Sequence, residues 1–143
     1  MAKQKFTYVD GDVEVFVEDQ KHGKKIQPKK LPVGQISQMP GNPDGFTPQR
    51  LLLNLVFELE EKPGDWLEDF DPPIEMHVRY QADDEKSAKQ LGKKLALAFW
   101  NGVEWIEFTK AKHDLKITSD AQGGVAVVKI KNWGDPPVSW GRI

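Results

Sequence analysis

The sequence predicts an all-β, immunoglobulin-like antiparallel β-sandwich of about eight strands, formed as a single domain over residues 1–143. Three observations support this class. Apolar and polar residues alternate along several short segments, most regularly over 74–80. Turn signals separate these segments at spacings typical of a sandwich or barrel. At most one short helix is expected, within residues 83–94, where an aspartate would cap a polar segment.

The strongest local signal is the segment 95–108, in which two alternating apolar runs flank Asn101-Gly102. Asn-Gly in this setting is typical of a two-residue hairpin turn, which would pair Trp100 with Val103. The period of two then separates the side chains onto two faces. One would be the core face, with Leu95, Leu97, Phe99, Ile106 and Phe108, and the other would carry Ala96, Ala98, Trp100, Val103, Trp105 and Glu107.

The other strands are expected in regular order along the chain. Asp10-Gly11 predicts a second two-residue hairpin, with Val13, Val15 and Val17 on one face of its longer arm. Alternating leucines favour a strand over the competing helix in 51–60. Together with the central hairpin, the expected strands are 6–9, 12–18, 51–60, 74–80, 95–100, 103–108, 114–118 and 124–131.

Two segments are expected to be extended or rich in loops. Residues 19–50 form a long connection rich in proline, glycine and lysine, where only a short extended piece around 31–36 is expected. The tail 132–143 is expected to be extended, because Pro136 and Pro137 restrict the backbone there. The gap between residues 60 and 74 suggests that the chain crosses between sheets.

Composition excludes several classes of protein. With 20 basic and 22 acidic residues, the formal charge of −2 does not indicate a nucleic-acid partner. The chain has no cysteine, which excludes disulfides and thiolate metal sites. No apolar run approaches the roughly 20 residues that cross a bilayer, so no membrane partner is expected. The N-terminal residues lack an apolar signal region, so the protein is expected to be soluble and, if Met1 is the native start, cytoplasmic.

No catalytic or metal-binding constellation is evident in the sequence. None of the histidines, His22, His77 and His113, has a partner at metal-ligand spacing. The acidic clusters at 65–71 and 83–85 indicate solvated loops rather than a calcium site. Phosphate-binding and nucleophile-elbow motifs are absent. The sequence therefore predicts no catalytic residue, no metal and no cofactor, and an enzyme with a site built from scattered residues is the weakest alternative.

The tryptophans carry the functional alternatives. The second face of the central hairpin is either covered by the loop 60–72, with Trp66 and Phe70, or forms an exposed aromatic platform for a glycan or a partner protein. The candidate binding surface consists of Trp100, Trp105, Trp133 and Trp140.

Residues 50–132 resemble the ZU5-type, immunoglobulin-like modules of bacterial surface and eukaryotic adaptor proteins. The resemblance rests on a proline-led strand at 70–80, the hairpin at 95–105 and a closing strand at 124–131. The glycine-rich opening segment of that family is not evident, and Asn132-Trp-Gly-Asp-Pro-Pro137 replaces its histidine-containing continuation. Such modules share no catalytic residues, so the resemblance implies a non-enzymatic scaffold for protein contacts.

These observations predict a protein-interaction or assembly module that is not an enzyme. Its partner would be another protein or a second copy of the chain, because an extended segment can add to an exposed sheet edge. The alternative is a carbohydrate-binding module that uses the exposed tryptophans.

Overall fold

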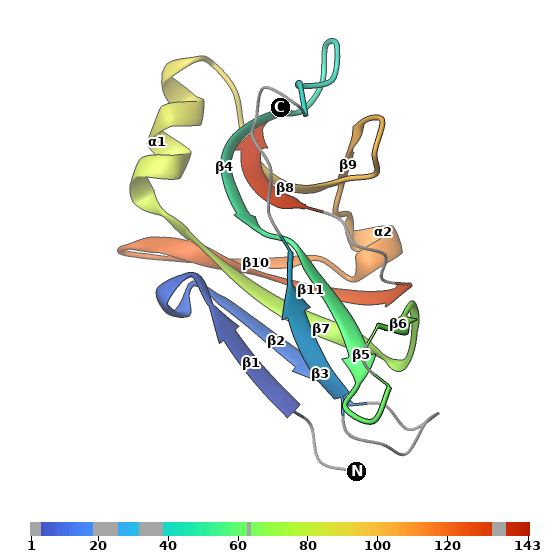
Figure 1. Ribbon diagram of the computed structural model, residues 1–143. Coiled ribbons are helices and arrows are strands. Elements are labelled where there is room, and N and C mark those ends of the chain that lie inside the picture. The colour runs from blue at the N-terminus through green and yellow to red at the C-terminus, as the bar shows by residue number, and fades with distance from the viewer. Residues whose placement is uncertain (1–3, 19–25, 32–38, 63, 133–136) are drawn as a thin grey trace.

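The computed structural model describes residues 4–18, 26–31, 39–62, 64–132 and 137–143, with only the backbone described at Leu53. These residues form mainly antiparallel strands arranged in three sheets (Figure 1). The predicted all-β, sandwich-like class is therefore confirmed. The described residues contain twelve strands, which is more than the eight expected from the sequence.

The largest sheet has five strands in the order β1-β2-β7-β11-β10. Every neighbouring pair in it is antiparallel. Its longest strand contains the alternating segment 74–80, as the sequence predicts. The strands are β1 (Gln4–Tyr8), β2 (Val13–Val17), β7 (Asp69–Gln81), β11 (Gly123–Asn132) and β10 (Lys116–Asp120).

Two smaller sheets pack against this one. The four-stranded sheet, in the upper part of Figure 1, has the order β4-β12-β8-β9, with β4 (Thr47–Leu53), β12 (Val138–Arg142), β8 (Leu95–Trp100) and β9 (Trp105–Glu107). The three-stranded sheet, at the lower right, has the order β3-β5-β6, with β3 (Ile26–Lys30), β5 (Leu55–Leu59) and β6 (Trp66–Leu67).

The predicted strand 51–60 is divided between the two smaller sheets. Asn54 separates β4 from β5, and its carbonyl accepts a 2.9 Å hydrogen bond from the backbone N–H of Leu31. All five residues of β5 are buried, so the expected alternation between a core face and a polar face does not hold there. From β5 the chain passes through β6 into β7, which confirms the crossing between sheets expected over 60–74.

The connection 19–50 contains more regular structure than the sequence predicts. Strand β3 and the first residues of β4 lie within it, because both find backbone partners in strands distant in sequence. Most of the short extended piece expected at 31–36 lies outside the described residues. In the described part of the tail, β12 is extended as predicted, and it pairs with both β4 and β8 in the interior of its sheet.

Both predicted hairpins form, but each has a four-residue loop instead of a two-residue turn. Tyr8 pairs with Val13, and Trp100 pairs with Trp105. In the second loop, Asn101 Oδ1 accepts the backbone N–H groups of Val103 at 2.9 Å and Glu104 at 2.8 Å, which stabilises the longer connection. In the second hairpin the partner of Trp100 shifts by two residues, from Val103 to Trp105, so the side chains of β8 and β9 keep their expected faces. Val103, expected on the second face, lies in the loop and is exposed.

Among the described residues, three short helical segments accompany the sheets: η1 (Val9–Gly11), α1 (Ala82–Gln90) and α2 (Lys110–His113). Helix α1 is the short helix predicted within 83–94. Asp84 helps to cap it by accepting the backbone N–H of Gln81 at 2.8 Å. Ala88 is buried as expected, whereas Leu91 is 59% exposed. No helix in the described part of the chain is long and apolar enough to span a membrane.

The main core lies between the five-stranded sheet and the two smaller sheets. The inner faces of β2 and β7 supply the residues that the alternation predicts, and all of these side chains are buried. They are Val13, Val15 and Val17 on β2, with Ile74, Met76, Val78 and Tyr80 on β7.

A second, smaller core lies on the other side of the four-stranded sheet. It contains Met39, Phe46, Ala98 and Trp105, with Leu51, Ala96 and Trp100 packed against them. Each face of the β8–β9 hairpin therefore has its own apolar layer.

Candidate interaction surface

The predicted tryptophan surface is not assembled in this fold. Trp105 is 2% exposed, and Trp140 is completely buried. The indole of Trp140 donates to the carbonyl of Arg79 at 3.1 Å and lies edge-on to the ring of Tyr80, with 5.0 Å between centroids. These two tryptophans are structural, and the expectation that they form part of an exposed binding surface is corrected.

Trp105 is covered by a different segment from the one expected. Its indole N–H donates to the carbonyl of Met39 at 3.0 Å, and the ring of Phe46 lies 5.3 Å away. The expected covering residues are elsewhere, because the strand that follows β5 belongs to the three-stranded sheet. Trp66 is 46% exposed there, and Phe70 is buried in the main core.

The other two candidate tryptophans are Trp100 and Trp133. Trp100 is half-buried, and its ring centroid lies 5.5 Å from that of Trp105. Trp133 lies outside the described residues. Of the four tryptophans proposed for glycan binding, Trp100 is thus the one whose described side chain reaches the surface in part.

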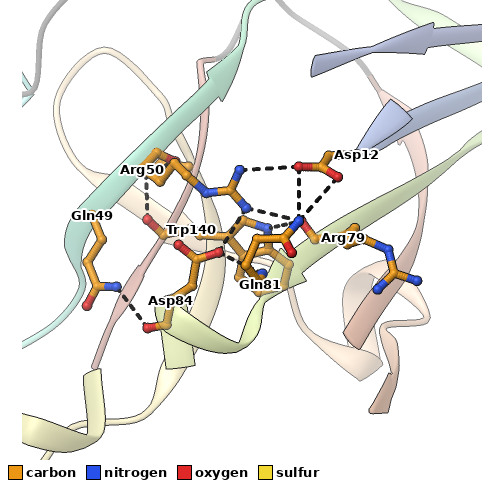
Figure 2. A network of polar contacts seen from close by, with 8 residues as sticks. Asp12, Gln49, Arg50, Arg79, Gln81, Asp84 and Trp140 are labelled. Atoms are coloured by element: carbon orange, nitrogen blue, oxygen red, sulfur yellow. Dashed lines mark hydrogen bonds and ion pairs between the residues drawn. The ribbon is translucent and has the colours of Figure 1, made fainter. Parts of the chain in front are cut away.

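A polar network centred on Arg50 joins the sheets, as Figure 2 shows. The Arg50 guanidinium lies 2.9 Å from Asp84 Oδ2 and 3.6 Å from Asp12 Oδ2. It also donates to the carbonyl of Arg79 at 3.3 Å. These contacts link β4 to the end of β7, the start of α1 and the turn before β2.

Further hydrogen bonds extend this network. Gln49 donates to the carbonyl of Asp84 at 3.2 Å (Figure 2). The Ser139 hydroxyl donates to the carbonyl of Arg50 at 3.0 Å. Gln81 Nε2 lies 3.3 Å from Asp12 Oδ2. These contacts hold the two sheets and α1 together, although the buried Nε of Arg50 has no hydrogen-bond partner among the described residues.

The outer face of the five-stranded sheet offers a different kind of surface. Here "outer face" means the side of this sheet that points away from the main core. Its side chains are half-buried or exposed, whereas the inner-face side chains of β2, β7 and β11 are buried. Its centre combines two rings with two branched side chains, namely Phe16, His77, Val125 and Val127.

The two rings on the outer face are positioned by contacts between neighbouring strands. The centroids of Phe16 and His77 lie 4.9 Å apart, and His77 Nε2 lies 3.0 Å from Glu75 Oε2. Lys5 Nζ lies 5.9 Å from the centroid of Phe16 and forms a 2.9 Å ion pair with Glu14. The apolar centre is therefore bordered by charges of both signs.

A depression of about 200 Å³ opens beside Phe16 on this face. Its walls combine an aromatic ring, two proline rings, two carboxylates and one ammonium group: Phe16, Pro72, Pro73, Glu18, Glu75 and Lys129. Such a lining suits a partner with mixed apolar and charged groups. No group of three or more His, Asp or Glu side chains placed to hold a metal occurs among the described residues.

Strand β10 forms one edge of the same sheet, and all five of its residues are exposed. Three residues of β10 lie on the outer face, as their partners on β11 do. Lys116 pairs with Val127, Thr118 with Val125 and Asp120 with Gly123. A hydrogen bond from the backbone N–H of Gln122 and another from the Arg79 guanidinium lower the pKa of the Asp120 carboxyl. Asp120 is therefore an anion at neutral pH.

The sequence contains a pattern that indicates the outer face, but the prediction from the sequence relied on the tryptophans instead. Phe16 is an aromatic residue on the otherwise polar face of a predicted strand, and Val125 and Val127 occupy the matching face of another. Only the pairing of β2 and β11 with the two sides of β7 brings these positions together.

Comparison of this chain with protein-family models, with curated proteins and with solved structures finds no match in any of the three. The resemblance to ZU5-type modules stays a prediction.

Proposed function

We propose that this protein is a non-enzymatic interaction module that binds another protein through the outer face of its five-stranded sheet. As part of this proposal, the protein is related to the immunoglobulin-like, ZU5-type modules that its sequence resembles. The observation that carries it is the contrast between the two faces of this sheet: one is buried, and the other presents an aromatic and branched apolar centre.

The composition of the outer face supports a protein partner. Protein interfaces typically combine an apolar centre that includes aromatic side chains with a polar, charged border. Phe16 and Val127 supply apolar area here, and Lys5, Glu14 and Lys129 lie around them. The burial of Trp105 and Trp140 leaves the alternative of glycan binding with less support.

Affinity purification from cells that produce the protein tests this proposal. Val127→Glu would place a charge in the centre of the outer face, and Phe16→Ser would remove its aromatic ring. Val103→Glu is the matched control, because Val103 is 82% exposed on the loop between β8 and β9. We expect the same protein partner with the wild type and Val103→Glu, and its loss with the other two variants.

Two results would overturn the proposal. One is a protein that captures no partner and sediments as a monomer at every concentration. The other is a partner retained equally by the wild type and by Val127→Glu, because binding would then use another surface.

A further inference from the structure

The β10 edge differs from the other sheet edges in the described part of the chain. Strand β10 has five residues, no proline and an unbroken register with β11 from Lys116 to Asp120. Ile117, on its inner side, is 50% exposed. A regular edge of this kind, rich in β-branched residues, offers unpaired backbone groups to another strand.

The remaining edges carry features that hinder such pairing. Strands β3 and β4 contain Pro28 and Pro48, which lack a backbone donor. Strands β6 and β9 have only two and three residues. Strand β1 is the exception, with five residues, no proline and an unbroken register, but pairing with itself around Phe6 would place no opposite charges across the interface.

The sequence of β10 is complementary to itself in the antiparallel direction. If two copies pair around Thr118, then Lys116 of each copy lies opposite Asp120 of the other, and the two threonines face each other. Both charged side chains lie on the outer face, on the same side of the extended sheet. The Ile117 side chains become diagonal neighbours on the other side.

Existing contacts leave Lys116 available for this pairing. Its ion pair with Asp114 is 3.9 Å long and joins side chains that are 70% and 45% exposed, so it contributes little. Asp120 Oδ2 accepts from Arg79 at 3.0 Å, and a carboxylate has room for a further donor.

We infer that the protein forms a two-fold symmetric dimer in which β10 of one copy pairs with β10 of the other and joins their five-stranded sheets. This inference goes beyond the proposed function, because the dimer uses the β10 edge rather than the outer face. The twofold axis passes between the two Thr118 residues. Each copy contributes the same edge, as a symmetric interface requires.

Complementary charge variants test the register directly by sedimentation equilibrium of the full chain. In a dimer of Lys116→Glu, the glutamate at position 116 of each copy would face Asp120 of the other. In a dimer of Asp120→Lys, the lysine at position 120 of each copy would face Lys116 of the other. We expect each variant to raise the dimer dissociation constant by about tenfold or more. An equal mixture should restore dimers, because each interface pair would then join opposite charges.

Lys89→Glu is the matched control. It makes the same charge change and removes a comparable exposed ion pair, since Lys89 lies 3.6 Å from Glu85, but it alters α1 rather than the edge. This control should dimerise as the wild type does. Circular dichroism of each variant would establish that it is folded.

The outcomes separate this inference from the proposed function. A dimer that Lys116→Glu leaves intact, or a mixture that stays monomeric, overturns pairing through β10, although binding through the outer face can still hold. A monomeric wild type that captures another protein, which Val127→Glu then fails to capture, also overturns the dimer and supports the proposed function. A monomer that captures nothing contradicts both.

Discussion

At the scale of single residues, His113 shows how a side chain can make stability depend on pH. It is half-buried against Phe99 and Phe108, with ring centroids 6.1 Å and 5.0 Å from its own. Its Nδ1 accepts the backbone N–H of Thr109 at 3.1 Å, which requires this nitrogen to be unprotonated. Burial, aided by the nearby Lys112 charge, lowers the pKa of His113 below its usual 6.5.

The direction of this shift gives a prediction about acid stability. As the pH falls below about 6.5, His113 takes up its proton at a higher pH in the unfolded chain than in the folded chain. The free energy of unfolding therefore falls with the pH. His113→Asn places an acceptor near the same position without a titrating ring. Urea unfolding between pH 7 and pH 5 should therefore show a smaller decline in the variant than in the wild type. Equal declines would show that His113 does not supply this dependence.

At the scale of elements, the side chain of Asn42 makes hydrogen bonds to β9 that a neighbouring strand would otherwise make. Its Nδ2 donates to the carbonyl of Trp105 at 2.7 Å, and its Oδ1 accepts the backbone N–H of Trp105 at 2.9 Å. A backbone partner would make the same two bonds. This amide holds the segment 39–46 over Trp105 and so closes the second core.

Removing this amide should weaken the second core. We expect Asn42→Ala to lower the free energy of unfolding by about 1–3 kcal/mol, because two backbone groups next to a buried side chain lose their partner. Tryptophan emission should shift to longer wavelength as Trp105 gains access to water. The control, Asn132→Ala on the exposed end of β11, should change stability by less than about 0.5 kcal/mol. Similar effects of the two substitutions would contradict this role.

At the scale of the whole molecule, the Arg50 network couples the sheets. Arg50 belongs to the four-stranded sheet, whereas Asp12 and Asp84 lie at one end of the five-stranded sheet. The Arg50 and Asp84 side chains are 29% and 14% exposed, so their interaction is less screened than a surface ion pair.

Breaking this network should cost more than breaking a surface pair. We expect Arg50→Met to lower the free energy of unfolding by about 1–3 kcal/mol, less than a fully buried pair because Arg50 is partly exposed. Lys89→Met removes an exposed 3.6 Å pair with Glu85 and should cost less than about 0.5 kcal/mol. Chemical denaturation of both variants makes the comparison. A loss at Arg50 no larger than that at Lys89 would argue against a coupling role.

Local pattern was enough to predict the strand faces. The inward positions of β2 and β7 follow from a side-chain period of two, which backbone geometry imposes wherever a strand forms. The same rule gave both faces of the β8–β9 hairpin, although its loop is two residues longer than the Asn-Gly signal predicts. Helix α1 was likewise visible as a polar, capped segment.

The candidate surface was much less predictable. Trp105 and Phe46 are 59 positions apart in the sequence, and no local pattern indicates that the segment around Phe46 covers this indole. Trp140 lies in a tail that looked merely extended, yet β12 is an inner strand of its sheet. An aromatic side chain at a strand position is consistent with either burial or exposure until its covering segment is known.

The sequence by itself determined the all-β class, the inward faces of the main strands and helix α1, because these depend on spacing along the backbone. Tertiary structure alone decided which tryptophans are buried, that β4 and β5 belong to different sheets, and that β10 is an open edge. These features depend on which strands become neighbours. That choice is made by the summed packing of residues far apart in the chain.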